Sequence, residues 1–180
     1  MLLTYNDCIK EYGNVYQINK RIASQELFKI QKGLYTNERY ASDLSIINHL
    51  FPNAVLTMRN ALYYHGLTDV VPDNFDLMTG RNDSKIRSPR IKQYFCPKHL
   101  LNIGVEIMNY NGINIRVYSK ERMMIELIRY KDKLPFAYYK EVLSHYRDIL
   151  YELNIETLQE WIEIFPKSQH ISKTIRAEVF

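Results

Sequence analysis

Residues 14–37 of this 180-residue chain read NVYQINKRIASQELFKIQKGLYTN, and the stretch changes from a helical period to a strand period. In its first half the apolar residues Val15, Ile18 and Ile22 recur at three- and four-residue steps, which predicts a helix with one apolar stripe. After residue 26 the pattern becomes that of two short strands, with Gly33 supplying the turn between them. A helix followed by a short hairpin is therefore predicted.

The residues before this stretch predict another helix. Apolar side chains within residues 5–12 recur at helical spacing, Thr4 is a suitable N-cap and Gly13 a suitable stop. Two helices followed by a hairpin are typical of a winged helix-turn-helix, which we expect over residues 1–40.

The remainder, residues 41–180, predicts a mixed domain with a small antiparallel sheet and a helical C-terminal part. One predicted element is a hairpin of two alternating strands around Asn111-Gly112, a dipeptide strongly favoured in two-residue hairpin turns. The fold class expected for the whole chain is α+β. The other strands are expected at residues 54–56, 75–79 and 91–95, and the helices at 38–50, 57–64, 119–130, 136–151, 155–165 and 168–179.

The composition indicates a globular protein with no membrane span. The chain is 46% hydrophobic and 24% charged, which is ordinary for a globular protein. Cys8 and Cys96 are far apart and lie among hydrophobic neighbours, so we expect buried free thiols and a reducing, cytoplasmic setting. No apolar run reaches the roughly 20 residues of a membrane span, and the first residues do not resemble a signal peptide.

The net charge of +4 comes entirely from the first 100 residues. They hold 13 of the 24 lysines and arginines but 9 of the 20 acidic residues, whereas residues 101–180 hold 11 of each. A basic N-terminal part suits contact with a polyanion. It is also compatible with solubility alone.

The predicted helix at residues 14–24 carries side chains suited to the major groove of DNA. Its polar face can contact base edges and phosphates, and two lysines near the hairpin tip can contact flanking phosphates. The alternative is that these side chains only solvate an amphipathic helix. The predicted DNA-binding residues are Tyr16, Gln17, Lys20, Arg21, Lys29 and Lys32.

Four segments together resemble the AbiEi-type antitoxins, predicted regulators of phage-defence loci. AVLTMRNALYYHGLTD at residues 54–69 is similar to that family's central signature, and KGLY at 32–35 is similar to its wing. VYSKER at 117–122, with RYKDKL at 129–134, resembles its strand-to-helix element. The chain departs from the family in leaving little room for a third helix in the DNA-binding module.

The resemblance implies an antitoxin that represses its own operon. The N-terminal module would bind operator DNA, and the C-terminal domain would counteract a nucleotidyltransferase-like toxin without forming a stable complex with it. We expect a monomer or weak homodimer with no cofactor and no metal. The expected partner surface comprises Arg59, Tyr63, His65, Asp69, Arg81, Lys85, Arg87, Arg90 and Arg122; its densest basic stretch, residues 81–92, is opposed only by Asp83.

Two other readings stay open at this point. One is an interaction protein that restrains its toxin by direct contact and does not bind DNA. The other is a Mg²⁺-dependent nuclease, because Pro72-Asp73 and Asp83-Ser84-Lys85 formally match a nuclease signature. The second half of that signature should lie on a strand, whereas residues 80–84 have the composition of a turn. His65 and Asp69 are not accompanied by a recognisable Ser or Cys nucleophile, and a histidine near the C-terminus of a helix is favoured by the helix dipole. A structural role is therefore expected for them, and no enzyme is predicted.

Overall fold

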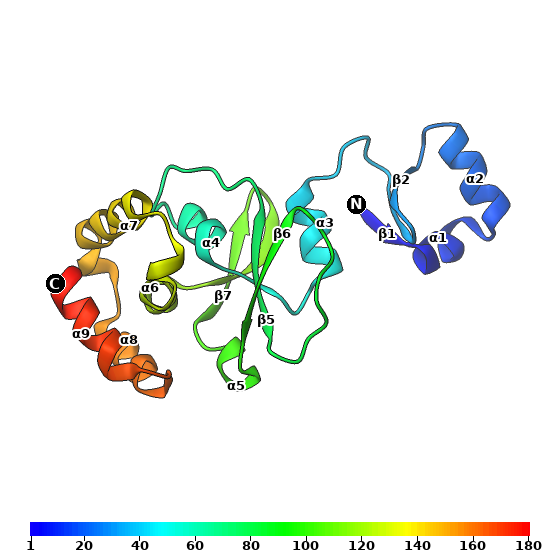
Figure 1. Cartoon of the computed structure of the whole chain (residues 1–180). Coiled ribbons are helices and arrows are strands. Elements are labelled where there is room, and N and C mark those ends of the chain that lie inside the picture. The colour runs from blue at the N-terminus through cyan, green and yellow to red at the C-terminus, as the bar shows by residue number, and fades with distance from the viewer. The chain divides into compact units, whose positions relative to one another are not determined.

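The computed structural model describes residues 1–180 and divides into two compact units, Met1–Pro52 and Asn53–Phe180 (Figure 1). Both are built from helices and strands, which confirms the α+β class. None of the helices has both the length and the apolar character needed to cross a bilayer.

The N-terminal unit contains a three-stranded antiparallel sheet with the order β1-β3-β2. The predicted helices and hairpin are present, and β1, a strand of three residues, was not predicted because so short a run shows no alternation. Its elements are β1 (Leu2–Thr4), α1 (Tyr5–Tyr12), α2 (Val15–Ala23), β2 (Phe28–Gln31), β3 (Leu34–Thr36) and α3 (Asp43–Leu50).

Local signals fix the start and end of α1. The Thr4 hydroxyl accepts a hydrogen bond from the backbone N–H of Asp7 at 3.2 Å, and the Asp7 carboxylate accepts one from the backbone N–H of Thr4 at 2.9 Å. This reciprocal arrangement is a capping box. Gly13 ends the helix at φ 90°, a conformation that disfavours residues with a Cβ.

A small core holds the N-terminal unit together, formed by Leu3, Cys8, Ile18, Leu27 and Tyr35. The unit extends to Pro52 and not to about residue 40 as predicted, because α3 packs on β1. In the predicted apolar stripe of α2, Ile18 is buried and Ile22 partly buried, but Val15 in the first turn is exposed.

The C-terminal unit contains a five-stranded sheet with the order β6-β5-β4-β8-β7. Its strands are β4 (Val55–Leu56), β5 (Phe75–Gly80), β6 (Ile91–Cys96), β7 (Val105–Tyr110) and β8 (Ile113–Tyr118). The pairs β5·β6 and β4·β8 are parallel, and β4·β5 and β7·β8 are antiparallel.

The predicted small antiparallel sheet is therefore wrong in this part, since the sheet is mixed. The connection at residues 81–90 is long enough to run back along β5, so that β6 starts beside the start of β5: Phe75 pairs with Ile91 and Gly80 with Cys96. Alternation of apolar residues shows which side of a strand is buried but not which way its neighbour runs.

The hairpin of β7 and β8 is confirmed. Tyr110 pairs with Ile113 across the turn, and the turn residues Asn111 and Gly112 have φ of 49° and 81°. Two consecutive positive φ values are the mark of the type I′ turn that Asn-Gly favours.

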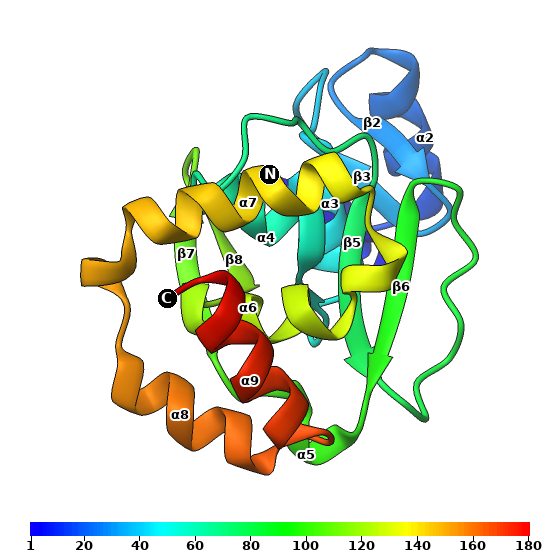
Figure 2. The same ribbon diagram turned by 60° about the vertical axis from the view of Figure 1, so that its left-hand side comes forward.

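Helices fill the rest of the C-terminal unit (Figure 2). Short α4 contacts both β5 and α6, and α6 in turn contacts α8 and α9, so α6 lies at the centre of the helical layer. Seven consecutive residues of α6, from Arg122 to Ile128, are buried. The helical segments are α4 (Met58–Tyr64), α5 (Lys98–Leu101), α6 (Lys120–Arg129), η1 (Lys131–Lys133), α7 (Phe136–Asp148), η2 (Leu150–Glu152), α8 (Ile155–Ile164) and α9 (Ser168–Glu178).

Gly104 precedes β7 and has a φ of 71°. A Cβ at this position would lie 2.5 Å from the Cβ of Arg122 and 2.8 Å from the Trp161 ring. Gly104→Ala is expected to lower the free energy of unfolding by about 2–4 kcal/mol, from backbone strain and overpacking together. Urea denaturation measures this. Gly112→Ala is the control, because it has similar strain but no atom within 4 Å, and it should cost clearly less.

Candidate nucleic-acid interface

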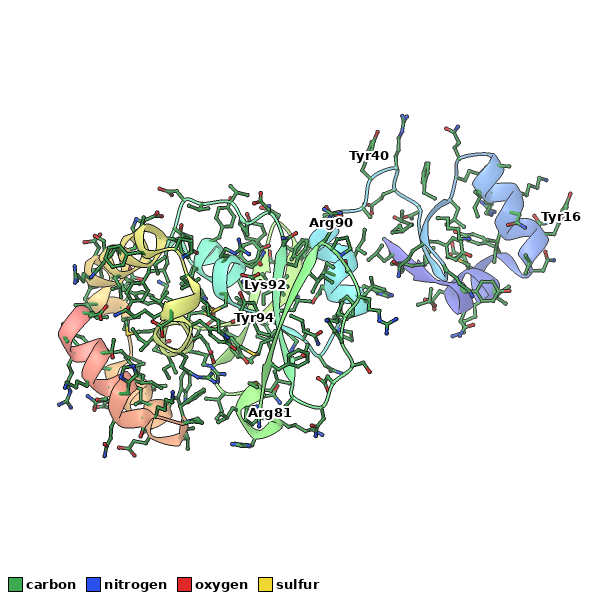
Figure 3. The ribbon with its side chains drawn as sticks, viewed as in Figure 1. Tyr16, Tyr40, Arg81, Arg90, Lys92 and Tyr94 are labelled. Atoms are coloured by element: carbon green, nitrogen blue, oxygen red, sulfur yellow. The ribbon has the colours of Figure 1, made fainter.

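The exposed face of α2 is the first half of the candidate interface. Asn14 caps the helix by accepting a hydrogen bond from the backbone N–H of Gln17 at 3.0 Å, and Ile18 anchors it in the core. Tyr16 is 73% exposed and points away from the helix (Figure 3). With Gln17 and Lys20, which are also exposed, it presents one aromatic, one amide and one cationic side chain to solvent.

Arg21 differs from its neighbours on α2 because its guanidinium already has partners. It forms an ion pair with Glu26 at 2.6 Å and lies 4.6 Å from the centre of the Tyr12 ring. Glu26 follows α2, so this pair ties the end of the helix to the segment that enters β2. A base or phosphate would have to compete with Glu26 for Arg21.

The β2–β3 hairpin is the second half of the candidate interface. Lys29 on β2 and Lys32 in the turn are exposed, and residues 27–37 contain no acidic side chain. The backbone N–H of Tyr5 donates to the carbonyl of Gly33 at 3.0 Å, which ties the tip of the hairpin to the start of α1. The hairpin therefore carries two exposed cations, and its tip is braced by a hydrogen bond to the start of α1.

A second group of cations lies on the connection between β5 and β6. Arg81, Lys85, Arg87 and Arg90 are all exposed. Arg81 and Arg90 lie at opposite ends of the two strands, so the positive charge is spread along their length (Figure 3). The single acid, Asp83, accepts a hydrogen bond from the backbone N–H of Gly80 at 2.7 Å and serves the turn.

Gln93 on β6 holds this connection in place. Its amide oxygen accepts from the backbone N–H of Ile86 at 2.8 Å, and its amide nitrogen donates to the Ser84 carbonyl at 3.1 Å and to the Thr79 hydroxyl at 2.8 Å. The connection is thus ordered against the strand. Sequence reasoning missed this residue, since a glutamine within a strand carries no mark of what it binds.

Arg59, at the start of α4, binds the carboxylate of Asp76 on β5. Its backbone N–H and its side-chain Nε donate to the Asp76 carboxylate at 3.1 and 3.3 Å, and its side chain is 32% exposed. Asp76 thereby takes the place of the N-cap, since the Thr57 hydroxyl makes no cap bond and donates instead to the sulfur of Met123. Burial raises the pKa of Asp76, and the nearby Arg59 opposes that rise.

The other residues expected on the partner surface differ in accessibility. Asp69 is exposed in the loop after α4, and Tyr63 is half-buried, edge-on to Tyr64 at 5.8 Å between ring centres. The His65 side chain is only 5% exposed and bonds to the Tyr118 carbonyl at 2.7 Å, so it joins the end of α4 to β8.

The expectation that Arg122 lies on the partner surface is wrong. Its side chain is fully buried, donates to the carbonyls of Leu100 and Ile103 at 2.9 and 3.0 Å, and pairs with Glu126. Its guanidinium lies between the rings of Tyr118 and Phe165, at 4.3 and 4.4 Å from their centres. Arg122 therefore joins α6 to the loop before β7 and is not available to a partner.

The residues of the formal nuclease signature do not form a metal site. Asp73 precedes β5, while Asp83 lies in the turn after it and serves the Gly80 N–H. No three His, Cys, Asp or Glu side chains gather as metal ligands anywhere in the chain. Cys8 and Cys96 are buried free thiols, as predicted.

Buried His65 should make the stability of the chain depend on pH. Burial lowers its pKa below the usual value of 6.5. The unfolded chain therefore takes up a proton on this side chain as the pH falls through 6.5, while the folded chain resists it, so the free energy of unfolding should fall below that pH. Denaturation at pH 7.5, 6.5 and 5.5 measures this. His65→Gln should show a smaller fall, and an unchanged fall would contradict the assignment.

Comparison with known proteins finds a protein of similar fold. No family model matches the chain, and no curated protein matches it. A crystal structure of the RV2827C protein from Mycobacterium tuberculosis is similar, with a TM-score of 0.73 over 99% of this chain and 72% of that one, at 13% identity. At that identity the likeness extends to the fold alone.

Proposed function

We propose that the chain is a DNA-binding antitoxin that represses its own operon. In this proposal residues 1–52 are a winged helix-turn-helix, with α1 and α2 as the helix pair, α2 as the helix that enters the major groove, and the β2–β3 hairpin as the wing. The observation that carries the proposal is the exposed polar face of α2 together with a braced hairpin bearing two lysines and no acid.

Different residues serve different parts of the recognition. Gln17 has the geometry to bond an adenine edge bidentately, and Tyr16 can contact a base or a sugar. Lys20, Lys29 and Lys32 provide phosphate contacts, which fix register and supply most of the affinity. Arg21 orders the end of α2 through Glu26 and contributes less to reading bases.

The antitoxin part of the proposal rests on the resemblance of residues 32–35, 54–69, 117–122 and 129–134 to the AbiEi-type antitoxins. The C-terminal unit would then counteract a nucleotidyltransferase-like toxin, and the cationic connection at residues 81–90 is the surface best suited to a polyanionic or acidic partner. An inverted-repeat operator would take two copies of the N-terminal unit.

One experiment separates repression from antitoxicity. The chain is expressed beside a reporter under its own upstream region and, separately, beside the toxin of its operon. Lys20→Ala/Lys32→Ala should lose repression and keep toxin protection, while Lys10→Ala, which removes an exposed charge from α1, should keep both. If the double variant still represses, the proposed DNA surface is wrong; if the unaltered chain gives no protection, the antitoxin role is wrong.

A further inference from the structure

A cavity of about 320 Å³ lies beside β6, the edge strand of the five-stranded sheet. Lys92 and Tyr94 contribute from β6, and Tyr130 and Lys133 from the segment after α6. Met58 and Leu134 are among the apolar residues that line it. Its volume is at the lower end of the range for small-molecule sites in proteins. Lys92 and Tyr94 project from β6 (Figure 3), and only the packing of η1 near this strand brings Lys133 to them.

Two ammonium groups at the cavity are free of carboxylates. The Lys92 nitrogen lies 5.2 Å from the centre of the Tyr94 ring, and the Lys133 nitrogen lies 5.1 Å from that of Tyr130. No acidic residue lines the cavity. The buried carboxylate of Asp76, the residue paired with Lys92 in the strand register, is already bonded to Arg59. The cavity lining therefore carries two ammonium groups and no carboxylate.

The two tyrosine rings give the cavity aromatic walls. Tyr94 and Tyr130 meet edge to face at 5.1 Å between centres and 86° between planes. Burial raises the pKa of both hydroxyls, so both remain protonated and able to donate at neutral pH. Tyr94 is buried and Tyr130 half-buried, so a ligand would meet only the parts of the two rings that line the cavity. Lys92 and Lys133 are exposed, so their ammonium groups can turn from the rings to an anion, which attracts a cation more strongly than a ring does.

We propose that this cavity binds a mononucleotide, with the base against the tyrosine rings and the phosphate at Lys92 and Lys133. A phosphate offers both ammonium groups charge-assisted hydrogen bonds, and a purine supplies the flat apolar surface that matches the rings. This site is separate from the DNA surface on α2 and does not depend on it.

Isothermal titration calorimetry of the full chain with adenosine monophosphate tests the proposal, with adenosine and inorganic phosphate as separate ligands. The nucleotide should bind measurably more tightly than either part alone. Lys133→Ala should weaken it by about tenfold or more, since one charge-assisted bond to phosphate is lost. Lys98→Ala, an exposed lysine on α5 outside the cavity, should leave the affinity unchanged.

Other outcomes overturn the proposal. Absence of binding would do so, as would nucleotide binding that Lys133→Ala leaves intact in a variant with unchanged circular dichroism. Phosphate binding as tightly as the nucleotide would leave a simple anion site, and tight binding of an acidic peptide without nucleotide binding would make β6 a peptide-docking edge. Lys20→Ala/Lys29→Ala/Lys32→Ala should bind the nucleotide normally, so the failure of DNA binding and the failure of this site can be told apart.

Discussion

Arg122→Ala is expected to lower the free energy of unfolding by about 3–5 kcal/mol, because it leaves the fully buried Glu126 carboxylate with fewer partners. Arg129 would remain bonded to Glu126 at 2.7 and 2.8 Å, but it lies at the rim of the cluster. The carbonyls of Leu100 and Ile103 would also lose their donor, and the space between the Tyr118 and Phe165 rings would empty.

Thermal and urea denaturation of the full chain measure this loss, and Arg129→Ala is the matched control. Arg129 shares the same carboxylate but keeps 21% of its side chain exposed, so water can replace part of what it supplies. Its substitution should cost less than that of Arg122. A loss below about 1 kcal/mol for Arg122→Ala would mean that the buried network does not hold α6 to the loop before β7.

Replacing Lys20, Lys29 and Lys32 together with alanine is expected to reduce the salt dependence of DNA binding as well as its strength. Each phosphate contact releases condensed counterions, so the slope of log K against log salt is about −0.9 per contact. Loss of three contacts should therefore make the slope shallower by roughly 2.7. Fluorescence anisotropy with a labelled duplex at several salt concentrations measures this.

Lys10→Ala is the control, because it removes a charge from the same unit but from α1. It should change the slope little. If the triple variant retains the slope of the unaltered chain, the DNA-contacting surface lies elsewhere. The cations at residues 81–90 would then be the next to test.

Much of the local structure could be predicted because its causes are local. The N-cap at Thr4, the stop at Gly13 and the turn at Asn111-Gly112 each depend on a few neighbouring residues. The exposed face of α2 followed from helical spacing in the same way. These local signals predicted the ends of α1 and the β7–β8 hairpin without reference to tertiary contacts.

What could not be predicted depends on distant residues. The parallel pairing of β5 and β6 is set by the path of residues 81–90, and β1 is a strand only because β3 lies beside it. Arginine side chains usually lie at the surface, and Arg122 is buried only because α6 packs in the interior. The cavity at Tyr94 and Lys133 is lined by β6 and by the segment after α6, and no sequence pattern links these two segments.

The central claim, that α2 and the β2–β3 hairpin read DNA, is tested most directly by comparing two labelled duplexes. One carries the upstream region of the chain's own operon, and the other carries the same bases scrambled. The account predicts tighter binding to the native duplex, with affinity that falls steeply as salt rises. Equal and weak binding to both duplexes would contradict it.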